Sequence, residues 1–102
     1  MKKASHIFFA LCFMLTSSCQ TNEESVAQKA IDRYIVFVDS VNKADFEKRK
    51  GRWDFIELEH TRKRNNAEAA LKVFRGKARE RESKRIAERD DKYKGLKAAI
   101  EY

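Results

Sequence analysis

The longest uninterrupted apolar run in this chain of 102 residues is Ile7 to Leu15, which holds nine residues. A helix needs roughly 20 apolar residues to span the hydrocarbon core of a bilayer, so this run is short for a permanent span. The basic start Met1-Lys2-Lys3 precedes it, a combination typical of a secretory signal peptide. We therefore expect residues 1–18 to be removed during export. A transmembrane helix and a buried core helix are the minority alternatives.

The residues that follow, Leu15-Thr16-Ser17-Ser18-Cys19, resemble a lipobox. At such a site a bacterial lipoprotein signal peptidase cuts before a cysteine whose thiol already carries a diacylglyceryl group. Small residues before the cysteine, here Ser17 and Ser18, suit the cleft of that peptidase, whereas Thr16 stands where a large aliphatic residue is usual. The pattern predicts lipidation of Cys19, with palmitate among its acyl chains, and leaves ordinary cleavage after Ser18 as an alternative.

Lipidation would hold the mature chain in a membrane of the cell envelope by its N-terminus. Two or three acyl chains anchor a protein firmly, whereas a single chain binds marginally. The residue after the cysteine is Gln20 rather than Asp, which favours the outer membrane. The other cysteine, Cys12, lies in the segment that export removes, so the mature domain has to fold without a disulfide.

Removal of 18 from 102 residues leaves 84, enough for one small domain. The chain has no proline, 38% of its residues are charged, and no stretch alternates apolar and polar residues as a strand does. We expect an all-α fold, with a tether at residues 19–24 and a helical domain over residues 25–102. That domain should be a small antiparallel helical hairpin or a three-helix bundle with a long charged C-terminal helix.

A first helix should begin near Asn22, because Thr21 and Glu24 have the spacing of a capping box. Its apolar residues recur at intervals of three and four, which is the pattern of one buried helix face. They are Val26, Ala27, Ala30, Ile31, Tyr34, Phe37, Val38 and Val41. The stripe is interrupted between Asn42 and Arg52, where a basic run meets Gly51, a plausible helix stop or kink, so we expect a turn there.

A second apolar stripe starts at Trp53 and keeps a period near 3.6 residues. Its members are Trp53, Ile56, His60, Ala67, Leu71, Phe74 and Ala78. Asn65-Asn66 and Gly76 would each be tolerable breaks, but because the phase is uninterrupted, we expect one long helix across Asn65. Phe37 and Trp53 should face each other as the largest apolar contact between the first two helices.

Residues 77–94 are the most charged part of the chain, with 13 of 18 residues acidic or basic. Three acids stand four residues before a base, the order that stabilises a solvated helix. The pairs are Glu80 with Lys84, Glu88 with Lys92 and Asp90 with Lys94. We expect a solvated helix here. The alternative is a docked helix whose buried line would be Ile86, Tyr93, Leu96 and Ile100.

Three segments of the first two helices form a recognisable series. They are Tyr34-Ile35-Val36-Phe37-Val38-Asp39-Ser40-Val41, Trp53-x-x-Ile56-Glu57 and Ala67-Glu68-Ala69-Ala70-Leu71. This series resembles a family of short helical lipoproteins of Bacteroidetes type that is classified as a domain of unknown function. Family members often carry a tyrosine where this chain has His60. The resemblance covers residues 30–75 and implies an envelope location and a helical fold, with no catalytic residue to carry over.

Few residues could carry chemistry. His60 is the one histidine left after export, and no thiol remains, which is too little for a zinc site. Its place on the apolar stripe predicts a satisfied, half-buried side chain rather than a catalytic base. Glu57 and Glu59 should point to different helix faces, so they form no carboxylate pair for acid–base catalysis. We expect no enzyme activity, no cofactor and no metal.

Positive charge is concentrated in the second half of the chain. Residues 19–61 hold 7 Lys/Arg against 9 Asp/Glu, whereas residues 62–102 hold 14 against 7. A basic surface distal to the lipid would attract anionic partners such as lipid headgroups, lipopolysaccharide or cell-wall polymers. The expected contacts are Arg79, Arg81, Lys84, Arg85 and Arg89. Nucleic acid is not an expected partner, because acids alternate with the bases and export separates the chain from it.

The sequence therefore predicts an envelope lipoprotein that acts as a small helical structural or interaction module. Its expected surface for a protein partner is the apolar edge near the C-terminus, formed by Tyr93, Leu96, Ile100 and Tyr102. The alternative function is a basic binding module for an anionic envelope component.

Overall fold

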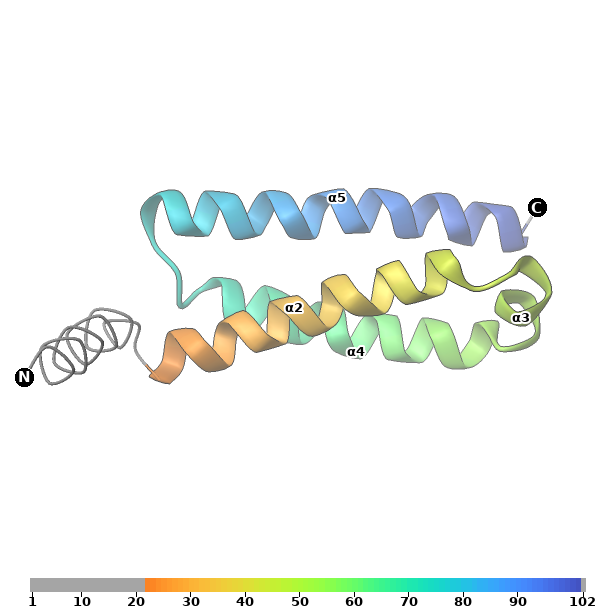
Figure 1. The fold of residues 1–102 in the computed structure, drawn as a ribbon, viewed down its shortest axis with the longest axis horizontal. Coiled ribbons are helices and arrows are strands. Elements are labelled where there is room, and N and C mark those ends of the chain that lie inside the picture. The colour runs from red at the N-terminus through yellow and green to blue at the C-terminus, as the bar shows by residue number, and fades with distance from the viewer. Residues whose placement is uncertain (1–21, 102) are drawn as a thin grey trace, which may run out of the picture.

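The computed structural model describes residues 22–101, which form helices and no strand. In chain order the helices are α2 (Asn22–Lys43), α3 (Phe46–Gly51), α4 (Trp53–Leu71) and α5 (Gly76–Glu101). The helix α2 packs against both α4 and α5. The chain runs in the same direction in α2 and α5 and in the opposite direction in α4 (Figure 1). The predicted all-α fold is confirmed, in its three-helix form with a long charged last helix.

The helix α2 begins at Asn22, as the capping-box spacing predicts, with Glu23 and Glu24 in its first turn. Acidic residues there face the positive end of the helix dipole. Residues 22–24, which were expected in the tether, are therefore helical, and residues 1–21, with the predicted signal peptide and Cys19, lie outside the described residues.

The buried face of α2 differs in part from the predicted stripe. It consists of Ala27, Ile31, Tyr34, Ile35, Val38 and Val41. Ile35 was missed, and Val26 was wrongly placed in the core, since 62% of it is exposed. The reason is that α2 has two neighbours, so its buried face is wide and turned toward α5 as well as α4.

The second predicted helix is interrupted. It continues through Asn65 as expected, but it ends at Leu71, and a new helix begins at Gly76. Gly76 has a φ of 58°, a left-handed conformation that glycine adopts without steric cost. Phe74 stays buried inside this turn, which is why the apolar phase runs on although the chain reverses.

The charged helix α5 is docked on the bundle, so the expectation of a solvated helix is wrong. Only 2% of Ile86 and 3% of Tyr93 is exposed, and Leu96 and Ile100 pack against the same core. None of the three predicted pairs within the helix occurs among the described residues. Arg85 instead binds Asp32 of α2 at 3.2 Å, and Arg89 binds Asp39 of α2 at 3.1 Å. Arg85 and Arg89, which were expected to face water, therefore join α5 to α2.

Truncation of Ile86 to alanine should therefore destabilise the whole bundle. Removing a buried isoleucine side chain typically costs about 2–5 kcal/mol of unfolding free energy. The matched control is Val36→Ala, which truncates an exposed β-branched residue of α2 and should change stability by less than about 0.5 kcal/mol. Denaturant unfolding of the full chain measures both. Equal, small effects of the two substitutions would show that α5 is not docked.

Candidate functional site

The centre of the bundle holds polar side chains from all three long helices. Tyr34 of α2 is fully buried, and its hydroxyl donates a hydrogen bond to Asp90 of α5. Arg64 of α4 donates to both oxygens of Asp90, with its Nε 3.0 Å from each and its terminal nitrogen 2.9 Å from Oδ2. The Nε2 atom of His60, also on α4, lies 3.1 Å from the Tyr34 oxygen. This cluster, named here the Asp90 cluster, joins α2, α4 and α5.

The hydrogen bonds of the Asp90 cluster fix its protonation. Tyr34 has one hydroxyl proton, which goes to Asp90, so the Nε2–H of His60 donates to the Tyr34 oxygen. Burial lowers the pKa of His60, which keeps the ring neutral near pH 7. Burial alone would raise the pKa of Asp90, but hydrogen bonds from Arg64 and Tyr34 outweigh it and hold that pKa below its ordinary value.

An aromatic stack lies beside the Asp90 cluster. The ring of Tyr93 lies 3.5 Å from that of His60, nearly parallel to it, and 5.6 Å from that of Trp53 on its other side. Trp53 therefore stacks on α5, whereas the ring of Phe37 faces His60 at 6.5 Å. The predicted pairing of Phe37 with Trp53 is replaced by these contacts, because α5 inserts Tyr93 where Phe37 was expected.

The hydroxyl of Tyr93 donates to Glu57 at 2.5 Å, and Lys97 binds the other oxygen of Glu57 at 3.2 Å. The hydrogen bond from Tyr93 lowers the pKa of Glu57, and Lys97 adds to this effect. Burial and the bond to Glu57 raise the pKa of Tyr93, so its hydroxyl stays protonated. The Glu57 carboxylate is thus bound by the Tyr93 hydroxyl on one oxygen and by Lys97 on the other.

These contacts bear out two sequence predictions. His60 is half-buried and satisfied, bonded to Tyr34 and stacked on Tyr93. Glu57 faces α5, whereas Glu59 binds Arg62 and Lys63 of its own helix, so the two acids lie on different faces. Within residues 22–101, no group of three or more His, Cys, Asp or Glu side chains is placed to hold a metal ion. The hydrogen bonds of His60, Asp90 and Glu57 join helices to one another.

The predicted anion-contacting residues do not form one outward surface. Arg85 binds Glu82 at 2.7 Å as well as Asp32, and Arg89 binds Asp39. Arg81 lies 3.3 Å from Glu82, a carboxylate that is buried with only 1% exposure. Arg79 and Lys84 are exposed and have no carboxylate partner among the described residues. Two of the five are therefore engaged with α2, and a third with Glu82.

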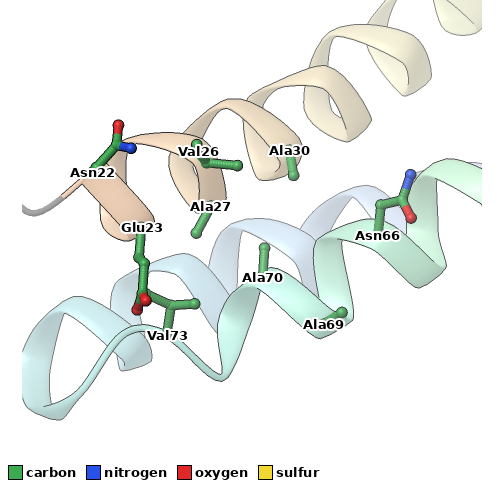
Figure 2. Close-up of a pocket in the computed structure, with 9 residues that line it drawn as sticks. All are labelled: Asn22, Glu23, Val26, Ala27, Ala30, Asn66, Ala69, Ala70 and Val73. Atoms are coloured by element: carbon green, nitrogen blue, oxygen red, sulfur yellow. The ribbon is translucent and has the colours of Figure 1, made fainter.

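The predicted partner edge is also used inside the protein. Tyr93 is buried, Leu96 and Ile100 are half-buried against the core, and Tyr102 lies outside the described residues. Exposed apolar surface lies instead on the side of α2 and α4 away from α5. A groove of about 510 Å³ runs there between the two helices, with Ala27 and Ala30 facing Ala70 (Figure 2).

Comparison of this chain with protein-family models, with curated proteins and with solved structures found no match. The resemblance to short helical lipoproteins therefore stays a prediction. None of the helices in the described part of the chain is both long and apolar enough to cross a membrane.

The Asp90 cluster predicts a specific response to acid. The imidazole of an unfolded histidine has a pKa near 6.5, and burial lowers the pKa of His60 in the folded protein. Just below pH 6.5, the unfolded chain therefore binds a proton at His60 more readily than the folded protein does. The unfolding free energy should therefore start to fall below pH 6.5. Asp90, Glu57 and Glu82 also have lowered pKa values, so a second loss should follow as pH drops below about 4.5, where unfolded carboxyl groups take up protons.

Denaturant unfolding between pH 8 and 3 measures this profile. The variant His60→Gln keeps a side-chain N–H donor for Tyr34 and cannot titrate, so it should lose the part of the profile that starts at pH 6.5. The loss below about pH 4.5 should remain, since it belongs to the carboxylates. A wild-type profile that is flat from pH 6.5 to 5 would contradict the assignment of a half-buried, neutral His60.

Proposed function

We propose that the chain is a lipid-anchored protein of the cell envelope, with the outer membrane as the favoured location, and that it acts as a non-catalytic helical interaction module. The observation that supports the anchor is the position of the core in the described residues. The helix α2 starts at Asn22, three residues after Cys19, and the first buried residue of the described core is Ala27. Cleavage before Cys19 would therefore remove nothing from this core.

The interaction role is supported by how the polar side chains are used. His60, Asp90 and Glu57, three titratable groups with shifted pKa values, bind side chains of other helices in the bundle. A general base needs an acceptor within hydrogen-bond reach of a substrate proton. These groups point at one another instead, which favours a scaffold over an enzyme and requires no cofactor.

The variant Cys19→Ser should abolish fatty-acid labelling of the full chain in living cells, because serine offers no thiol for the thioether. The matched control is Cys12→Ser, which removes the cysteine of the apolar run and should still be labelled as strongly as the wild-type chain. Metabolic incorporation of an alkyne-tagged palmitate measures both. Labelling of Cys19→Ser, or no labelling of the wild-type chain, would contradict the anchor.

A second candidate function, binding of an anionic envelope component, is supported by where α5 starts. The sequence places the basic half far from the lipid, but the fold brings it back, since Gln28 of α2 donates to Glu82 of α5 at 2.6 Å. The turn between α4 and α5 and the start of α5 therefore lie at the same end of the bundle as the start of α2 (Figure 1). Four exposed cations belong to this segment. They are Lys72, Arg75, Lys77 and Arg79, and no carboxylate among the described residues pairs with them. Headgroups of the membrane that holds the anchor are the nearest anionic surface.

Energy transfer tests this candidate in vesicles that carry the full chain. A fluorophore on Ser83→Cys, made in the Cys12→Ser background, should transfer more strongly to a headgroup dye when the vesicles contain phosphatidylglycerol than when they are pure phosphatidylcholine. The difference should shrink between low and physiological salt, because screening weakens exposed charges. Reversing the charges of Lys72, Arg75 and Lys77 to glutamate should remove it. Equal transfer in the two vesicle types would contradict this function.

A further inference from the structure

The apolar groove near Asn22 is one part of a longer trough between α2 and α4. Four hollows follow one another along this seam, and neighbouring hollows share residues. The groove near Asn22 shares Ala30 and Asn66 with a small polar hollow beside it. That polar hollow shares Arg33 and Lys63 with a third hollow further along α2. The trough extends at least from Asn22 to Ser40 on α2, which at 1.5 Å per residue is about 27 Å.

The rim of this trough carries large apolar side chains that water reaches. The exposed fraction is 62% for Val26, 62% for Val36 and 52% for Phe55. Its floor near Asn22 is made of alanines from both helices, which leave room between the helix backbones (Figure 2). Exposed apolar patches bordered by polar residues, as in the hollows on either side of the polar one, are typical of protein-interaction sites.

The border of the trough is basic. The cations that line the four hollows are Lys29, Arg33, Lys48, Arg49, Arg52, Arg62 and Lys63. The acids that line them are Glu23 and Asp32, and Asp32 already binds Arg85 of α5. Glu59 offsets part of the charge of Arg62 and Lys63. The trough therefore keeps an excess of positive charge, and its occupant should be anionic along its edges.

The shape of the trough selects among anionic occupants. It is open to solvent along its length, so an acyl chain laid in it would keep one wet side. An amphipathic helix would bury its apolar stripe and turn its polar side outward. A second copy of this chain would bring two basic borders together, and like charges disfavour that contact. A length of about 27 Å corresponds to about 18 helical residues.

We propose that the trough between α2 and α4 binds an amphipathic helix of a partner protein, with an apolar stripe flanked by acidic residues. The bound helix would lie along α2 on the side opposite α5 and complete a four-helix packing. This inference rests on the interaction function proposed above and gives that function its surface and the chemistry of its partner.

The test uses two synthetic helical peptides of about 18 residues with the same leucine and alanine stripe. One has glutamates beside the stripe, and the other has lysines. The full chain, purified in a neutral detergent, carries a photo-crosslinking benzoyl-phenylalanine in place of Val36 on the trough or, as the control, in place of exposed Ser83 on α5. The glutamate peptide should crosslink at position 36 and not at position 83, and the lysine peptide should crosslink at neither.

Charge reversal supplies a second readout. The double variant Lys29→Glu, Arg33→Glu changes two exposed cations of the trough that have no carboxylate partner among the described residues. It should weaken binding of the glutamate peptide by about tenfold, measured by fluorescence anisotropy, and allow the lysine peptide to bind. The matched control Lys92→Glu, Lys94→Glu changes two exposed cations of α5 and should leave both affinities unchanged. Unchanged helicity by circular dichroism shows that each variant is folded.

Four outcomes would overturn the proposal. They are equal crosslinking of both peptides, equal crosslinking at positions 36 and 83, a crosslink between two copies of the chain, and a crosslink to detergent or lipid alone. The result is independent of the anchor, which is read by fatty-acid labelling of Cys19. A chain that binds the glutamate peptide but takes up no palmitate would refute the lipid anchor and support helix binding in the trough. A chain that takes up palmitate but does not bind the peptide would support the anchor and refute helix binding in the trough.

Discussion

A single half-buried carboxylate contacts side chains of both other long helices. Asp90 of α5 accepts hydrogen bonds from Tyr34 of α2 and from both donor positions of Arg64 on α4. Removing a carboxylate even partly from water costs free energy, and charge-assisted hydrogen bonds of good geometry offset that cost. A shift of α5 by one turn, about 5.4 Å, would leave Asp90 without these donors. In a helix whose buried apolar residues are few, this requirement sets the register more sharply than Ile86 and Tyr93 do alone.

The sequence predicted what depends on local spacing and missed what depends on distant partners. The passage of α4 through Asn65 and the half-buried state of His60 follow from periodicity, and the structure confirms them. Asp90 shows the limit of such reasoning. Its spacing to Lys94 suits a pair within one helix, worth a few tenths of a kcal/mol, but its partner is Arg64, 26 residues away. Charge order along a helix cannot distinguish these two cases.

The same limit explains the errors at the α4–α5 turn and in the partner surface. The periodic spacing of apolar residues shows which residues face a core, whether or not they lie in a helix. Phe74 faces the core from the turn between α4 and α5, so the apolar spacing continues although the chain reverses there. The signal available in the sequence was Gly76 itself, because glycine adopts without steric cost the positive φ that this turn requires. Once the chain reverses, Tyr93 enters the core between His60 and Trp53, and the edge expected for a partner becomes part of the domain.

The position of α5 also determines which surface remains for a partner. Because α5 covers one flank of α2 and contributes Arg85 and Arg89 to the acids there, the opposite flank keeps its apolar rim and its cations. The trough on that flank begins at Asn22, three residues after Cys19. Three residues of extended chain span at most about 10 Å. A lipid on Cys19 would therefore hold this end of the trough near the membrane. A helix bound along α2 would then approach the membrane at the end where Lys72 and Arg75 lie. A partner anchored in the same membrane could enter the trough from that end without detaching, and tethering both proteins would raise their effective concentration for each other.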